Sequence, residues 1–175
     1  MSSDYVGPVV LGENVTLPVI IYDGNGTPVD PTQSPVFRIY SSEQADALDV
    51  TGTLVKIDTG LISNATNAVP IVITTTVNHK LETGNHVTIS GVGGNTAANG
   101  AFRITKINNT SFSLDGSSGN GVYTSGGQWH LTGLYAMNLA VTGGNGFAEG
   151  KTYMAVIHWT IGTTTYGKCL VFNVV

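Results

Sequence analysis

Short segments in which apolar and polar residues alternate, each followed by a turn built on glycine, asparagine or aspartate, repeat along the whole sequence. Residues 15–22 followed by the turn 23–26 are the first clear example. Thr, Val and Ile supply 55 of the 175 residues, and β-branched side chains favour pleated strands. Another 23 residues are glycine, which suits tight turns. The sequence therefore predicts an all-β protein and excludes an all-helical fold.

The length of the alternating segments changes along the chain, and this change predicts how the chain is divided into domains. Longer strands are expected before residue 62 and again after residue 133, whereas the strands between them are shorter and the glycines denser. The predicted short strands are residues 71–77, 86–90, 101–107, 111–114 and 123–131. One short helix is expected over residues 41–48, where Ser41 and Gln44 stand at capping-box spacing.

These differences predict an immunoglobulin-like β-sandwich that carries an inserted, small β-barrel-like module. We expect residues 1–12 to form an N-terminal arm, residues 13–66 and 130–175 to form a discontinuous sandwich, and residues 67–129 to form the inserted module. Because Gly7 and Pro8 interrupt the apolar residues of the arm, we expect it to have little reason to order on an isolated subunit.

The central segment carries a specific motif. It runs HKLETGNHVTISGVGGNTAANGAFRIT over residues 79–105, continues through residues 111–114 and ends in the glycine-rich residues 119–127. This segment resembles a module of tailed-phage structural proteins that is also similar to a half-domain of ubiquitin-activating enzymes. Where that family usually has His-Gly-Leu and Gly-Asp, this sequence has His79-Lys80-Leu81 and Gly84-Asn85. The resemblance implies a fold and no catalysis, since the segment contains no cysteine.

The outer segments carry a second, more general pattern. Residues 12–19, 23–30, 133–135 and 150–153 combine strand alternation with turn residues in an order that resembles the immunoglobulin-like domains of phage virion proteins. Some baseplate proteins have such domains at their amino terminus. Two phage-associated resemblances in one short chain imply a virion protein.

Candidate catalytic and metal-binding residues are few and scattered. Asp23, Asn25 and Thr27 alternate as the first ligands of a calcium loop do, but the twelfth loop position is Ser34 where glutamate is needed, so a hairpin turn is favoured. The four histidines lack metal-ligand spacing. Cys169 lies in a predicted strand without an assignable base, and the acidic residues form no catalytic pair. We expect no catalytic residue, no cofactor and no metal, hence no enzyme.

Sugar binding is the strongest alternative chemistry, because aromatic residues on a β scaffold can stack on sugar rings. Under strict alternation Trp159 shares its face with Tyr153, Ala155 and Ile157, which favours a place in the core. Tyr123 and Trp129 stand among glycines, and they remain open between core and surface.

Charge and targeting signals narrow the partners. Only 10% of the residues are charged and the formal net charge is -4, so the chain has no positive electrostatic potential that would attract phosphate groups. We therefore expect no nucleic-acid binding. No apolar stretch is long enough to cross a bilayer, and residues 1–8 do not form a secretory signal. We therefore expect no membrane partner and assembly in a host cytoplasm.

Together these observations predict a structural virion protein of a tailed bacteriophage. The favoured function is an outer-capsid decoration or cement protein that clamps capsid subunits from the virion exterior. The alternatives are a neck, tail or baseplate component and a carbohydrate-binding adhesin module. Expected partners are the major capsid protein or other virion proteins, a homo-oligomer with a trimer favoured, and, for the adhesin, a host-surface glycan. The candidate interaction residues are Tyr5, Val9, Val10, Leu11, Tyr123 and Trp129.

Overall fold

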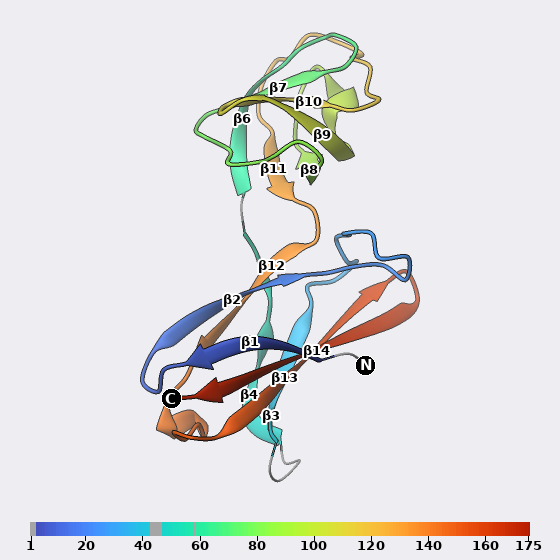
Figure 1. The fold of residues 1–175 in the computed structure, drawn as a ribbon. Helices are drawn as coiled ribbons and strands as arrows, with labels where there is room; N and C mark the ends of the chain where they lie inside the picture. Colours follow the sequence, from blue (N-terminus) through green and yellow to red (C-terminus); the bar gives the residue numbers. More distant parts are fainter. Residues whose placement is uncertain (1–2, 43–46, 58) are drawn as a thin grey trace. The chain divides into compact units, whose positions relative to one another are not determined.

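The computed structural model describes residues 3–42, 47–57 and 59–175, and these divide into two compact units (Figure 1). The first unit comprises residues 1–55 and 135–175, and the second comprises residues 56–134. The described residues form strands and two single 3-10 turns, η1 (Thr96–Ala98) and η2 (Gly143–Asn145), without an α-helix. The all-β prediction is confirmed. None of the described helical turns has the length and apolar character needed to span a membrane.

The first unit is a sandwich of two sheets (Figure 1). Its larger sheet has the strand order β1-β14-β13-β3-β4, and the smaller sheet has the order β2-β12-β5. The larger sheet consists of β1 (Ser3–Val9), β14 (Thr164–Val174), β13 (Thr152–Ile161), β3 (Val36–Ser41) and β4 (Ala47–Thr53). The smaller sheet consists of β2 (Asn14–Ile20), β12 (Leu134–Ala140) and β5 (Val55–Lys56).

One apolar core joins the two sheets of the sandwich. Strand β13 turns Tyr153, Ala155, Ile157 and Trp159 inward, and all four are buried. They contact buried residues of the smaller sheet, such as Met137, in one continuous cluster. Burial of a large apolar side chain contributes about 1.5 to 3 kcal/mol, so such a cluster is the main source of stability. The prediction that Trp159 belongs to the core is confirmed.

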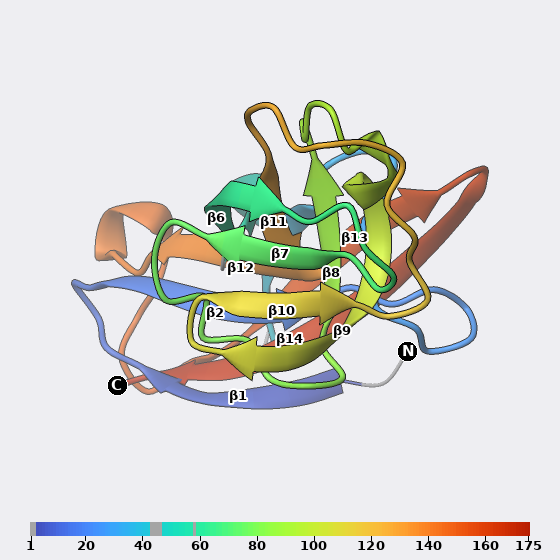
Figure 2. The ribbon, with the colours of Figure 1, turned by 90° about the horizontal axis from the view of Figure 1, so that it is seen from above.

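The second unit is a closed barrel whose strands follow the order β10-β7-β6-β11-β8-β9. Figure 2 shows β7, β10 and β9 side by side on one wall. The barrel consists of β6 (Thr59–Ala65), β7 (Val72–Thr75), β8 (His86–Ser90), β9 (Gly100–Asn108), β10 (Ser111–Leu114) and β11 (Gln128–Leu131). The predicted small barrel is therefore present, and β8 and β10 have their predicted bounds.

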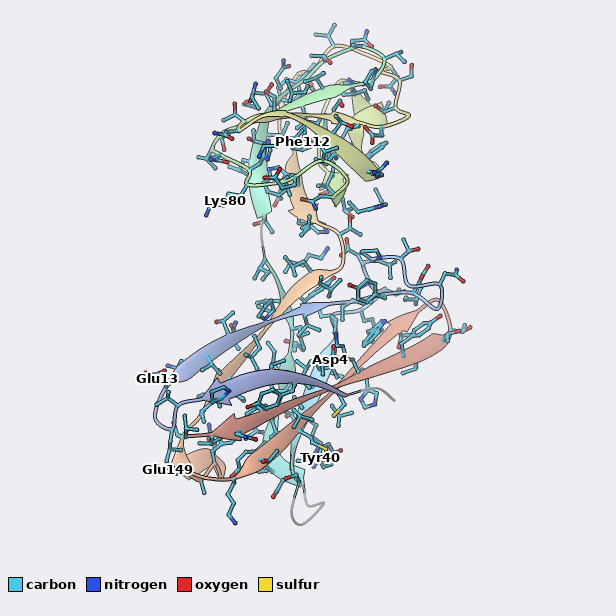
Figure 3. All side chains as sticks on the ribbon, in the orientation of Figure 1. Asp4, Glu13, Tyr40, Lys80, Phe112 and Glu149 are labelled. Atoms are coloured by element: carbon cyan, nitrogen blue, oxygen red, sulfur yellow. The ribbon has the colours of Figure 1, made fainter. Side chains whose placement is uncertain are left out.

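The interior of the barrel is a separate apolar cluster. Phe112, labelled in Figure 3, is fully buried and makes an edge contact with the Trp129 ring, whose centroid is 6.3 Å away. The ring of His79 also meets Phe112 edge-on, with 5.3 Å between centroids. Gly60 pairs with Trp129 across two strands, and a Cβ there would lie only 2.6 Å from the indole nitrogen. A glycine is therefore required opposite the indole.

Two expected boundaries of the barrel were wrong. Strand β6 was assigned to the sandwich, but it pairs with β7 and β11 and directs Ile62 and Ala65 into the barrel core. A register shift between Ile62 and Asn64 accompanies the exposure of Ser63 and Asn64, so this segment lacks the regular alternation by which a strand is predicted. The strand expected over residues 123–131 begins only at Gln128, and Tyr123 lies in the preceding loop.

The expectation of an unordered N-terminal arm was also wrong. Strand β1 pairs in parallel with β14, and the register shifts between Tyr5 and Pro8. Gly7 has a φ of 97°, and Gly7 and Pro8 form an irregularity within β1 without ending the strand. Proline is tolerated there because β1 is an edge strand. Val9 is buried, and Asp4 Oδ2 lies 2.8 Å from Lys168 Nζ. Strand β1 thus covers one edge of β14.

The short helix expected over residues 41–48 falls largely on residues 43–46, which lie outside the described residues. At its two ends Ser41 closes β3 and Ala47 opens β4, and these strands pair antiparallel. Strand pairing of β3 and β4 therefore takes precedence at both ends over the local capping pattern.

Candidate interaction surface

The larger sheet of the sandwich has one face turned away from the core. Residues paired directly across strands point to the same face, so Tyr5, Val171, Met154 and Tyr40 form one row across β1, β14, β13 and β3. The next row, with Leu170, Ala155 and Ile39, points the other way and is buried in the core. The Tyr5 row is therefore on the outer face, and Figure 3 labels Tyr40 there.

The two neighbouring outer rows combine apolar and polar side chains. One contains Cys169, Val156, Arg38 and Thr51, and the other contains Gly167, His158, Val36 and Thr53. We call these three rows together the outer sheet face. Tyr5 is 61% exposed on the edge strand β1 and Val36 is 48% exposed on β3, so two large apolar side chains of this sheet face solvent.

A shallow pocket of about 410 Å³ lies between β3, β4 and β13 on this face. Val36, Arg38 and His158 contribute to its lining, together with the two threonines of β4. An apolar floor with a guanidinium and an imidazole beside it can hold an apolar side chain that has a carboxylate or carbonyl nearby. The outer sheet face thus has the chemistry of a protein contact surface.

The four candidate residues of the N-terminal arm are separated by the structure. Tyr5 lies on the outer sheet face, whereas Val9 points into the sandwich core and is buried. Val10 and Leu11 follow β1 and are exposed, and the Leu11 N–H donates to the Val175 carbonyl. Of the four residues, only Tyr5 is part of the face described above.

The two aromatic candidates in the barrel do not form a stacking platform. Trp129 is only 3% exposed, and its Nε1 is buried without a hydrogen-bond partner among the described residues. Tyr123 is half-buried, and its hydroxyl lies 2.9 Å from the carbonyl of Gly126 and 3.2 Å from that of Ile62. The open question about Trp129 is resolved in favour of the core, which removes the main residue proposed for sugar binding.

The possible calcium loop is a turn in which the Asp23 carboxylate already accepts hydrogen bonds from the backbone. Asp23 Oδ1 accepts hydrogen bonds from the N–H groups of Asn25 at 2.8 Å and Thr27 at 2.9 Å. Tyr22 and Pro28 pair across the turn. Within the described ranges, no group of three or more His, Cys, Asp and Glu side chains could hold a metal ion.

The histidines are dispersed, and His79 has a structural role. Its Nδ1 accepts from the Leu81 N–H, and its Nε2 donates to the Asn108 carbonyl, both at 2.9 Å. The ring thereby connects its own loop to the end of β9. His130 Nε2 lies 2.9 Å from Lys56 Nζ, while His86 pairs across strands with Arg103.

Two ionisable groups of the sandwich are perturbed. Burial raises the pKa of the Cys169 thiol, which makes it a poor nucleophile at neutral pH. Burial and the nearby Asp30 carboxylate raise the pKa of the Tyr135 phenol, whose hydroxyl donates to Asp30 Oδ1 at 3.3 Å. Both shifts favour the neutral, protonated form, so neither group has the activated state expected of a catalytic residue.

Residues 67–131 match the family model described as the ubiquitin-activating enzyme E1 FCCH domain. The match covers a little over a third of the chain and includes most of the barrel. That domain is a non-catalytic half-domain. No curated protein matches the sequence.

One departure from the family pattern has a conformational consequence. Lys80, which stands where the related modules usually have glycine, has a φ of 55°. This left-handed conformation is costly for a residue with a Cβ. Asn78 Oδ1 accepts a hydrogen bond from the Lys80 N–H at 2.9 Å and so supports the turn.

Sequence reasoning missed most of the outer sheet face. A signal was present in the middle of β13, where the apolar Met154 and Val156 alternate with core residues, so that both faces are apolar there. A strand that is apolar on both faces indicates either a fully covered sheet or a contact surface.

Proposed function

We propose that this protein is a structural component of a tailed-bacteriophage virion, namely an outer-capsid decoration protein. It attaches to capsid subunits through the outer sheet face of an immunoglobulin-like sandwich. The FCCH-type barrel and the phage-associated resemblances of both segments support a binding role. The protein assembles in the cytoplasm of the infected host, and its final location is the exterior of the virion.

The observation that carries the proposal is the Tyr5 row of the outer sheet face. Its residues come from four strands that the sandwich core holds rigidly in register. A rigid apolar surface binds a partner with little loss of conformational entropy. Repeated over many copies, burial of this surface would raise the free energy required to rupture the shell, because each copy binds only the assembled state.

Cosedimentation with capsids that lack the protein tests this proposal. Tyr5→Glu places a charge in the Tyr5 row of the outer sheet face and should reduce binding at least tenfold, as expected for a buried, unpaired carboxylate at an interface. The matched control is Ile20→Glu, because Ile20 is a 38% exposed apolar residue on β2 in the other sheet. Equal binding by both variants, with both folded by circular dichroism, would contradict the proposed surface.

The same preparation separates the capsid from the tail. A high copy number spread over the shell supports decoration, and a low copy number confined to the neck, tail or baseplate favours that alternative. We also propose a trimer, because closed symmetry would protect the exposed edges of the outermost strands β1 and β4. Analytical ultracentrifugation that finds only monomer, together with isolated single copies on particles, would contradict the trimer.

A further inference from the structure

Four asparagines are followed directly by glycine, namely Asn25, Asn99, Asn120 and Asn145. Such pairs are chemically labile, because glycine has no side chain to shield its backbone nitrogen. That nitrogen can attack Cγ of the asparagine, expel ammonia and close a succinimide ring. Water then opens the ring to aspartate or isoaspartate. All four asparagines are exposed, so solvent access alone does not rank them.

Two of these side chains are held at both ends of the amide. Asn99 Oδ1 accepts from the Val92 N–H and its Nδ2 donates to the Val92 carbonyl, both at 2.9 Å. Asn120 Oδ1 accepts from the Ala97 N–H at 3.0 Å, and its Nδ2 donates to Thr96 Oγ1 at 2.9 Å. Rotation of either amide toward the following glycine must break two hydrogen bonds.

Asn145 is held by one bond. Its Nδ2 donates to the Ala140 carbonyl at 3.0 Å, and the N–H of the following Gly146 donates to the Gly143 carbonyl. The attack at this site therefore requires the loss of one side-chain bond and one backbone bond.

Asn25 differs from the other three. The described residues provide no hydrogen-bond partner for its side chain, and only its backbone N–H is bound, to Asp23 Oδ1. The Gly26 N–H is held only by the Asp23 carbonyl at 3.1 Å in an exposed turn. Nothing lies within 4 Å of the position that a Cβ of Gly26 would occupy, so this part of the turn is open.

We propose that Asn25 is a site of spontaneous deamidation in the folded protein, and that the four sites rank Asn25, then Asn145, then Asn99 and Asn120. The reaction consumes one water, releases one ammonia and adds one negative charge per chain. An isoaspartate also lengthens the main chain by one carbon in a turn that is closed by the Tyr22 and Pro28 pair. The Trp159 Nε1–H donates to the Tyr22 carbonyl at the base of this turn. The inference is independent of the proposed virion function.

The test follows all four sites in one sample. Purified protein is kept in mildly alkaline buffer at physiological temperature, native or in guanidinium chloride, and peptide mass spectrometry measures conversion at each asparagine. The denatured rate gives the intrinsic reactivity of each pair. We expect the native rate at Asn25 to stay within about threefold of its denatured rate, and the rates at Asn99 and Asn120 to fall at least about tenfold. Native protection of Asn25 as strong as that of Asn99 would overturn the proposal.

A variant tests whether hydrogen bonds cause the ranking. Thr96→Ala removes the acceptor of Asn120 Nδ2 and should raise the native rate at Asn120 while Asn25 and Asn145 stay unchanged. Asn99 is the internal control for barrel stability, since a general loss of structure would raise its rate too. An unchanged rate at Asn120 in a folded variant would contradict the mechanism.

Discussion

The sandwich and the barrel are both β structures with their own apolar cores, but they organise their loops differently. The sandwich has long strands, with ten residues in β13 and eleven in β14, and their pairing satisfies most of the backbone. The barrel has strands as short as four residues, so more of its backbone lies in loops. Where strands are short, fewer backbone N–H and C=O groups are paired within a sheet, and side chains form hydrogen bonds with the remaining ones.

Asn95 is the centre of that polar network in the barrel. It is completely buried, its Nδ2 donates to the Thr66 carbonyl at 2.8 Å, and its Oδ1 accepts from the Asn120 N–H at 3.0 Å. Asn99 and Asn120 then bind further loop residues through both ends of their amides. The described part of the sandwich shows no comparable buried amide, because its buried residues are almost all apolar.

The largest effect should come from truncating one aromatic residue in each core. Phe112→Ala in the barrel and Phe172→Ala in the sandwich each remove a fully buried ring and should cost about 3 to 5 kcal/mol. Because the two clusters share no residue, hydrogen exchange should show the loss of protection mainly in the unit that carries the substitution. Equal loss in both units after either substitution would show that they unfold as one.

Deletion of residues 1–10 should be the next largest effect. It removes the buried Val9 and exposes the edge of β14, so we expect a loss of about 2 to 4 kcal/mol in thermal unfolding. Asp4→Ala is the control, because it removes only a surface ion pair with Lys168 and should cost less than about 1 kcal/mol. An unchanged melting temperature after the deletion would mean that β1 contributes nothing to the isolated subunit.

The polar network of the barrel is tested by replacing its central amide. Asn95→Ala leaves backbone groups of two loops without partners and should cost about 1 to 3 kcal/mol in denaturant unfolding. The same substitution at Asn138, an exposed residue of the sandwich that accepts from Thr16 Oγ1, should cost less than about 0.5 kcal/mol. Similar losses at both positions would remove the distinction between the two units.

Alkaline pH should weaken the sandwich through Tyr135. The folded state holds the pKa of this phenol above its unfolded value of about 10, so the stabilisation is complete below that pH and is lost as the pH rises beyond it. Tyr135→Phe removes the ionisation and should flatten the fall in unfolding free energy above that pH. If the variant keeps the wild-type pH slope, Tyr135 is not the group responsible.

The smallest effect is a gain in the barrel. Lys80→Gly removes the Cβ from a residue with φ of 55°, and relief of this strain should exceed the entropy that glycine adds to the unfolded chain, for a net gain of about 0.5 kcal/mol. Lys80→Ala is the control, since it keeps the strain and should not stabilise. A loss of stability on Lys80→Gly, measured by denaturant unfolding, would contradict the strain argument.

Local patterns in the sequence were sufficient for the strands and the small barrel, because alternation and glycine turns act over a few residues. They were insufficient for β1, whose partner β14 is remote in sequence, and for β6, whose partners are set by closure of the barrel. Trp129 could not be assigned for the same reason, because its burial depends on Gly60, which is remote in sequence. Tyr5 was named as a candidate interaction residue, but the row that it shares with Tyr40 requires the pairing of four strands.

The parallel pairing of β1 with β14 has a consequence for synthesis on the ribosome. Ser3 pairs with Cys169, so the first strand to emerge must wait for almost the last one before its edge is satisfied. The barrel strands, in contrast, all lie between residues 59 and 131 and can close while the rest of the sandwich is still being translated. During that interval the apolar residues of β1 and β2 stay without their sheet, which makes this stage of synthesis the most exposed to misassembly between nascent chains.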